Sequence, residues 1–151
     1  MTTPVISGTL FKSIFDNKTD KSFSQANWNA FLRVLYDLSE VHRKSKRDAM
    51  LMSPAIYEKG TTRANRNVIE WAGWCAVDVD DFEIEGDLHD TLFDKFGHYT
   101  FCCYSTASST KDSPKFRLVF PLTTSVAVDK IKHFWYALNT ELGDLADKQT
   151  K

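Results

Sequence analysis

Two aspartates on one short segment are the side chains whose types and spacing could do chemistry. Asp78 and Asp80 alternate with Val77 and Val79. In a β-strand, residues i and i+2 point to the same face, so the two carboxylates would stand side by side, with Cα atoms roughly 6–7 Å apart. Carboxylates at that spacing can bridge two divalent cations about 3.5–4 Å apart, as phosphoryl transfer uses them. Hard oxygen ligands favour Mg²⁺ or Mn²⁺.

A pair of aspartates in a strand can also lie on the solvent-facing side of an edge strand. Two features argue against that interpretation. The preceding run, residues 74–76, is apolar on both faces, as in a central strand, where adjacent carboxylates seldom lack a partner. Residues 78–94 also contain eight acidic residues and no Lys or Arg. The aspartate pair alone is compatible with a glycosyltransferase, a nuclease or a polymerase.

A second motif, residues 105–122, combines hydroxyl groups with cations. Residues 105–110 contain five Ser or Thr, and Lys111, Lys115 and Arg117 follow them. Hydroxyl and cationic groups of this kind can cradle phosphate. Lys115 and Arg117 would share one strand face, while Phe116 takes the other. The alternative is a solvated turn, which is the commoner role of a Ser- and Thr-rich loop.

The hydrophobic periodicity predicts the elements that position these residues. Strands are expected over residues 5–11, 50–52, 69–82, 99–104 and 116–120, and helices over 24–41, 88–96 and from about 126 onward. Ser24 is the expected N-cap of the first helix. The last two strands follow each other through a ten-residue loop, as in a hairpin. We therefore expect an α+β fold with a mixed or antiparallel central sheet and flanking helices.

Composition limits the class of protein. The 151 residues suit one domain, and 42% hydrophobic with 26% charged residues is typical of a globular chain. No apolar run reaches the roughly 18 residues that would span a bilayer, and the first residues do not form a secretory signal. Three cysteines without C-x-x-C spacing argue against a disulfide framework or zinc site. We expect a cytoplasmic protein with no membrane partner.

The two motifs together resemble the archaeo-eukaryotic primase superfamily. "VDVDD" is followed by a helix and then by "YSTASSTKDSPKFRLVFPL", as in the primase-polymerase domains of phages and plasmids, which are often joined to a replicative helicase. The upstream "RANRNV" also fits. The resemblance covers residues 63–122 well and 126–147 more loosely. It implies an RRM-like catalytic core spanning residues 1–151, either as a minimal domain or as the N-terminal part of a longer replication protein in a bacterial host cell.

The resemblance also implies a metal site and a reaction. Asp78 and Asp80 would bind two Mg²⁺ or Mn²⁺ ions, with Asp147 as the third acidic residue and Asp144 as its fallback. The chain would then be a DNA-directed nucleotidyltransferase. It would transfer nucleotides from NTP or dNTP onto a primer or an initiating nucleotide on a single-stranded DNA template.

The resemblance assigns the second motif to the nucleotide. Ser108 matches a phosphate-contacting serine, and Arg117 would face the triphosphate or the template, with Lys115 beside it. One position departs from the family pattern, because Ser109 stands where relatives commonly have His. A hydroxyl can donate to phosphate but cannot carry charge or transfer a proton as imidazole does. Either Lys111 or Lys115 substitutes, or catalysis is weakened and the chain is a DNA-binding replication accessory domain. A nucleotide-sugar transferase is the further alternative.

The resemblance implies a role for a basic stretch upstream of the aspartates. Residues 43–66 contain seven basic and two acidic residues, although the whole chain has a net charge of −1. Such a stretch could hold template phosphates by counterion release, and the alternative is a solvated basic loop. The DNA-binding candidates are Arg43, Lys44, Lys46, Arg47, Arg63 and Arg66.

Overall fold

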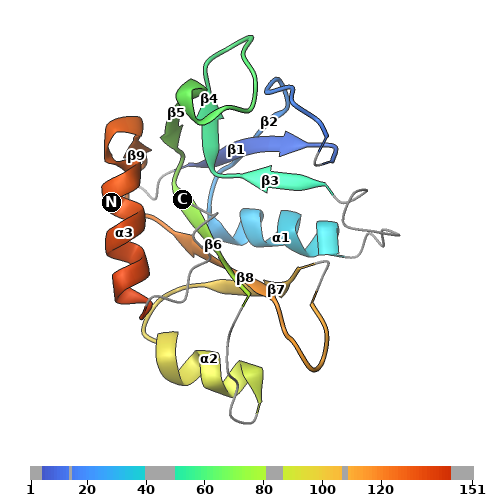
Figure 1. The fold of residues 1–151 in the computed structure, drawn as a ribbon, viewed down its shortest axis with the longest axis vertical. Coiled ribbons are helices and arrows are strands. Elements are labelled where there is room, and N and C mark those ends of the chain that lie inside the picture. The colour runs from blue at the N-terminus through green and yellow to red at the C-terminus, as the bar shows by residue number, and fades with distance from the viewer. Residues whose placement is uncertain (1–4, 14, 40–49, 81–86, 107–108, 144–151) are drawn as a thin grey trace.

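A computed structural model describes residues 5–13, 15–39, 50–80, 87–106 and 109–143. Within them the fold is α+β, with three small antiparallel sheets and three α-helices (Figure 1). The helices are α1 (Trp28–Ser39), α2 (Leu88–Phe96) and α3 (Val128–Glu141). The strands are β1 (Ile6–Phe11), β2 (Ser22–Gln25), β3 (Leu51–Ser53), β4 (Ala55–Tyr57), β5 (Val68–Trp71), β6 (Trp74–Val79), β7 (Cys102–Ser105), β8 (Phe116–Pro121) and β9 (Val126–Ala127). A short 3-10 helix, Asn65–Asn67, precedes β5.

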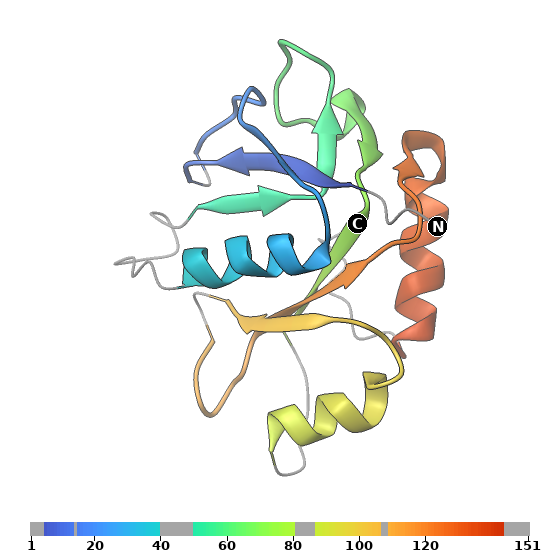
Figure 2. The ribbon, with the colours of Figure 1, turned by 180° about the vertical axis from the view of Figure 1, so that it is seen from behind.

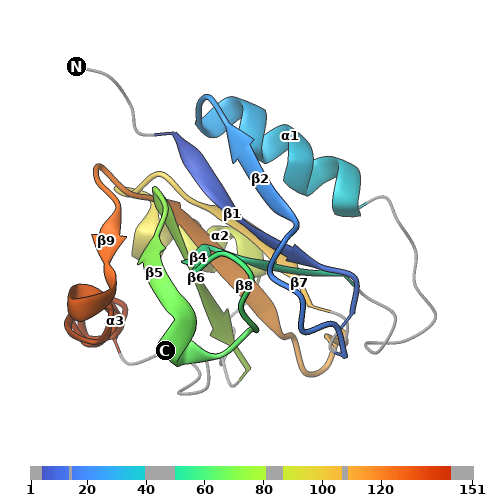
Figure 3. The same cartoon turned by 90° about the horizontal axis from the view of Figure 1, so that it is seen from above.

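The sheet of order β6-β8-β7 positions both sequence motifs. All its strand pairs are antiparallel, and β7 and β8 form the predicted hairpin. One face, with Cys75, Val77 and Val79 on β6, packs against α2 and α3 in a common apolar cluster. The opposite face, with Trp74 and Val119, packs against Phe31 and Leu35 of α1. Seen from above, α1 and α3 lie on opposite sides of the strands (Figure 3).

The N-terminal sheet, of order β2-β1-β3, contributes Ile6, Phe23 and Met52 to the same apolar cluster as α1. Phe23 of β2 stacks on Phe31 of α1, with ring centroids 5.9 Å apart. From behind, α1 runs between this sheet and β7 (Figure 2). The helix begins later than predicted, at Trp28, because Ser24 belongs to β2. The cap is provided instead by Asn27, whose Oδ1 accepts from the Ala30 N–H at 2.9 Å.

The predicted strand over residues 69–82 is two strands, β5 and β6, interrupted at Ala72 and Gly73. Gly73 has a φ of 84°, which breaks the extended chain. The interruption is held from three sides, because the Ser7 N–H donates to the Ala72 carbonyl, the Ala72 N–H donates to the Pro54 carbonyl, and the Leu122 N–H donates to the Gly73 carbonyl. β5 pairs with β4 and β9, whereas β6 pairs with β8. This kink at Ala72 and Gly73 therefore connects the β4-β5-β9 sheet to the β6-β8-β7 sheet.

Other boundaries differ by a few residues from the predicted ones. β7 begins at Cys102 rather than at residue 99, and α3 begins at Val128, after the short strand β9. Cys75 is fully buried as a free thiol, whereas Cys102 and Cys103 are half-buried. Among the described residues, no helix combines the length and apolar character needed to cross a bilayer.

Candidate functional site

The candidate site lies on the α1-facing side of the β6-β8-β7 sheet. The strand register places Asp78 on β6 directly opposite Arg117 on β8, and Arg117 opposite Tyr104 on β7. The three side chains thus form a row across three neighbouring strands. Their position follows from alternation, because their neighbours Val77, Val79 and Phe116 are buried on the other face.

Arg117 contacts both residues that flank it. Its Nε donates to Asp78 Oδ1 at 2.6 Å and its Nη2 donates to Asp78 Oδ2 at 3.2 Å. Its Nη1 donates to the Tyr104 hydroxyl oxygen at 3.2 Å. Both Asp78 oxygens are therefore engaged in a two-pronged guanidinium–carboxylate contact, the stronger geometry for such a pair. Residues 78–94 contain no Lys or Arg, and the cation that pairs with Asp78 is Arg117 of β8.

The row is partly accessible to solvent. The Arg117 and Asp78 side chains are 24% and 26% exposed. Burial lowers the pKa of the Arg117 guanidinium, but the hydrogen bonds and charges of Asp78 and Tyr104 raise it by more, so its pKa lies above its ordinary value. Burial raises the pKa of Tyr104, and the neighbouring guanidinium offsets part of that rise. Arg117 is thus a fixed positive charge, and Tyr104 is a neutral hydrogen-bond partner.

Asp80 follows Val79, the last residue of β6. Asp78 and Asp80 are both half-buried, while Val77 and Val79 are 1% and 0% exposed. The predicted placement of Asp78 on the face opposite the buried valines is confirmed, and the common face predicted for Asp80 stays a prediction. The predicted third acidic residue, Asp147, and its fallback Asp144 lie outside the described residues.

Hydrogen bonds close the base of the loop between β7 and β8. The Thr106 N–H donates to the Lys115 carbonyl at 2.9 Å, and the Lys115 N–H donates to Ser109 Oγ at 2.9 Å. Ser109 therefore has a structural contact, although its hydroxyl proton remains able to donate. Lys115 is half-buried beside the start of β8, whereas Lys111 is exposed. Ser108 lies outside the described residues.

The structure describes only two of the basic DNA-binding candidates. Arg63 is half-buried, with its guanidinium carbon 5.0 Å from the centre of the Phe11 ring. Arg66 is exposed on the 3-10 helix. The other four candidates, Arg43, Lys44, Lys46 and Arg47, lie outside the described residues.

A second acidic group lies at the exposed start of α2. Ligand atoms of Asp87, His89 and Asp90 all lie within 4.8 Å of one another, close enough to share a metal ion. Asp87 already caps the helix, because its Oδ1 accepts from the Asp90 N–H at 3.1 Å. These three residues were not grouped by the sequence motifs above. His89 Nδ1 lies 3.8 Å from Asp90 Oδ1, a local contact typical of an exposed surface.

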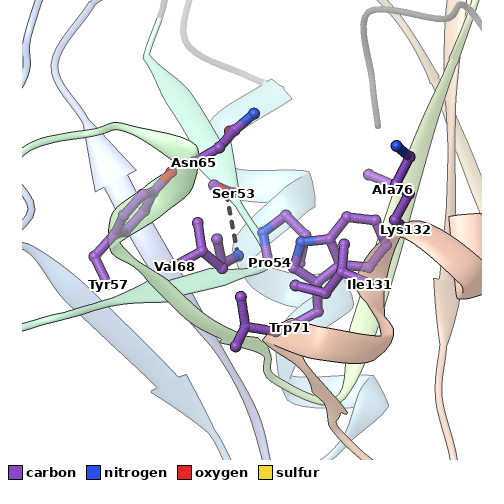
Figure 4. Close-up of a pocket in the computed structure, with 11 residues that line it drawn as sticks. Ser53, Pro54, Tyr57, Asn65, Val68, Trp71, Ala76, Ile131 and Lys132 are labelled. Atoms are coloured by element: carbon purple, nitrogen blue, oxygen red, sulfur yellow. Dashed lines mark hydrogen bonds between the residues drawn. The ribbon is translucent and has the colours of Figure 1, made fainter.

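A pocket of about 530 Å³ opens between β4, β5 and α3. Trp71, Val68 and Ile131 are among its apolar lining residues, and Asn65 and Lys132 are among its polar ones (Figure 4). Ala76 of β6 also lines it and precedes Asp78 by two residues, on the same face of the strand. Sequence analysis missed this pocket because its walls come from segments that do not adjoin in the chain. Tyr104 was missed for the same reason.

No protein-family model, curated protein or solved structure matches this chain.

Proposed function

We propose that the chain is the catalytic domain of a DNA primase-polymerase, an enzyme that adds nucleotides from NTP or dNTP to a primer or initiating nucleotide on a single-stranded DNA template. The observation that carries this proposal is the contact between Asp78 and Arg117 across β6 and β8. It joins the carboxylate motif to the phosphate-binding motif, two segments that are far apart in the sequence. An RRM-like core is part of the proposal, and the antiparallel pairing of the β6-β8-β7 sheet, with α2 and α3 together on one face, supports it.

The carboxylate motif fits divalent cations in its donor chemistry. Asp78 and Asp80 are both partly accessible and offer hard oxygen donors, which suits Mg²⁺ or Mn²⁺. These two residues would hold the ions, with Asp147 as the proposed third ligand. When bound, two such ions promote ionisation of the attacking 3′-hydroxyl and stabilise the charge that develops on the α-phosphate and the pyrophosphate.

The basic residues of β8 would orient the triphosphate. Arg117 keeps its charge at all physiological pH values, and its contacts with Asp78 and Tyr104 hold the guanidinium beside the carboxylate pair. Lys115 lies just before β8, two residues from Arg117, and would contact a second phosphate oxygen. Ser108, Ser109 and Lys111 of the adjoining loop would add donors to phosphate oxygens.

One contact favours a second candidate function, a DNA-binding replication accessory domain with weakened catalysis. Ser109 occupies the position at which relatives commonly have His, and its oxygen accepts a hydrogen bond from the Lys115 backbone. In this arrangement Ser109 shapes the loop and supplies no proton-transfer group. Replacing it discriminates between the two functions: a large rate gain in Ser109→His would show that the departure from the pattern disables catalysis.

The primary test is incorporation of labelled NTP or dNTP on a single-stranded template with Mn²⁺. The Asp78→Asn/Asp80→Asn variant keeps the shape of both side chains and an oxygen facing Arg117, but it removes the charges that hold the ions. We expect a loss of at least roughly 100-fold. The matched control, Asp94→Ala/Asp129→Ala, removes two exposed carboxylates elsewhere and should incorporate like the wild type. Equal incorporation by the wild type and the Asn variant, or none by the wild type, would refute the proposal.

A further inference from the structure

The pocket beside β6 has separate apolar and polar parts. Pro54, Val68, Trp71 and Ile131 gather on one side of it in the close-up (Figure 4). The amide of Asn65 and the ammonium group of Lys132 reach the opposite rim in the same view. Its volume of about 530 Å³ lies within the usual range of roughly 300–1,000 Å³ for small-ligand sites. A ligand that suits it has an apolar, flat part and an anionic part.

The aromatic walls are held in place by neighbouring rings. Trp71 packs against Phe134 with centroids 6.1 Å apart at an interplanar angle of 88°. Tyr57, on the other wall, packs against Phe11 with centroids 6.0 Å apart at 82°. Rings fixed in this way lose little conformational freedom when a flat ligand packs against them. Aromatic side chains of this kind bind nucleobases with little dependence on base identity.

The polar rim offers donors that the protein itself does not use. Within the described ranges, no hydrogen bond or ion pair joins the side chain of Lys132 or Asn65 to another residue. Lys132 can contact a phosphate as a point charge, and the Asn65 amide can pair with a base edge.

We infer that this pocket binds one nucleoside monophosphate unit, with its base in the apolar part and its phosphate at Lys132. The unit would come from a single nucleic-acid strand or from a free nucleotide. The single-strand source rests on the proposed function. Ala76, which lines the pocket, belongs to β6, the strand that also bears Asp78.

Strand binding without chemistry tests this inference. A fluorescein-labelled oligothymidylate is titrated with the full chain in EDTA, and binding is followed by anisotropy. We expect Lys132→Gln to bind roughly 3- to 10-fold more weakly and to reduce the slope of log K against log salt by about 0.7, the value for one phosphate contact on a single strand. The matched control is Lys130→Gln, an exposed lysine of α3 that does not line the pocket.

A second pair of variants tests entry of the base. Val128 lines the pocket and is 50% exposed, so Val128→Trp should fill the pocket without disturbing the core. We expect about 10-fold weaker binding, within the range for one stacked base. Val5→Trp is the control, because Val5 is 53% exposed and lies outside the pocket. An oligomer of abasic residues should bind the wild type and Val128→Trp equally. Circular dichroism confirms folding of each variant.

The outcomes separate the two sources and the two proposals. Displacement of the oligomer by millimolar dTMP, lost in Val128→Trp, would assign the pocket to a free nucleotide; failure of dTMP to displace it would assign the pocket to the strand. Binding in EDTA does not depend on incorporation, so pocket-dependent strand binding by a wild type that fails to incorporate nucleotides would keep the inference and refute the proposed function. Wild-type affinity in both Lys132→Gln and Val128→Trp would overturn it, as would an equal loss in Lys130→Gln.

Discussion

At the residue scale, Arg117 connects the two halves of the candidate site. It donates to both oxygens of Asp78 and to the Tyr104 hydroxyl. A guanidinium against a carboxylate lowers the charge that the carboxylate presents to other cations. Any divalent ion held by Asp78 must therefore share the carboxylate with Arg117 or displace it. In the proposed enzyme, the contact that positions Arg117 for a phosphate would weaken the metal site until the substrate binds.

Removing the Arg117 charge should tighten metal binding. A unit charge about 4 Å away contributes about 1 kcal/mol even in bulk water, so we expect Arg117→Met to bind Mn²⁺ at least roughly 5-fold more tightly, measured by the electron paramagnetic resonance signal of free Mn²⁺. Lys111→Met removes an exposed lysine of the neighbouring loop and should change the affinity by less than about 2-fold. Unchanged or weaker Mn²⁺ binding in Arg117→Met would show that Asp78 is not a ligand.

Cys75 makes stability depend on alkaline pH. Burial raises the pKa of its thiol to about 12 from an ordinary value of 9.0. The folded state therefore favours the protonated thiol, and this contribution is complete below pH 9 and is lost as the pH rises from 9 toward 12. Between pH 8 and 10.5 we expect the wild type to lose up to about 2 kcal/mol more unfolding free energy than Cys75→Ala. If the unfolding free energies of the wild type and Cys75→Ala, measured by urea denaturation, change equally with pH, the prediction is wrong.

At the element scale, the kink at Gly73 separates β5 from β6 and sets the direction of the strand that bears Asp78. Gly73 has a φ of 84°, and a Cβ there would lie 2.7 Å from the Val5 carbonyl oxygen. We expect Gly73→Ala to lower the unfolding free energy by about 2–4 kcal/mol, the combined cost of a left-handed residue and a backbone clash. Urea denaturation measures this loss.

Gly60 provides the matched control for this prediction. Its φ of 75° is similar, but a Cβ would meet no atom within 4 Å. Gly60→Ala should therefore cost only the conformational part, about 1–2 kcal/mol. Equal losses in the two variants would show that the contact with Val5 does not matter and that the kink is maintained by the glycine conformation alone.

Local patterns were sufficient to predict some features of the site but not others. The alternation of Asp78 with the valines depends on neighbouring residues, so both the face of Asp78 and the burial of Val77 and Val79 could be predicted. The pairing of Asp78 with Arg117, 39 residues away, depends on strand register, which long-range packing determines. The break at Gly73 depends likewise on distant segments, because the backbones of Ser7, Pro54 and Leu122 hydrogen-bond to Ala72 and Gly73. Local sequence patterns carry no information about such long-range contacts.

At the scale of the whole molecule, the β6-β8-β7 sheet is the wall shared by two apolar clusters. Trp74 and Val119 belong to the cluster with α1, and Val77 and Leu118 belong to the cluster with α2 and α3. Because alternate residues of the same strands enter the two clusters, neither can lose its packing without disturbing the strands that support the other. The arrangement favours one cooperative unit, as the length of the chain predicts.

Core truncation on either face should therefore destabilise the whole described fold. Phe31 on α1 is 0% exposed and Leu92 on α2 is 4% exposed. We expect losses of about 3–5 kcal/mol for Phe31→Ala and about 2–5 kcal/mol for Leu92→Ala. Phe15→Ala, at a site that is 71% exposed, should change stability by less than about 0.5 kcal/mol. Urea transitions followed by tryptophan fluorescence and far-ultraviolet circular dichroism should coincide in every variant. Two separated transitions, only one of which shifts in Phe31→Ala, would show that the faces of the sheet fold as independent units.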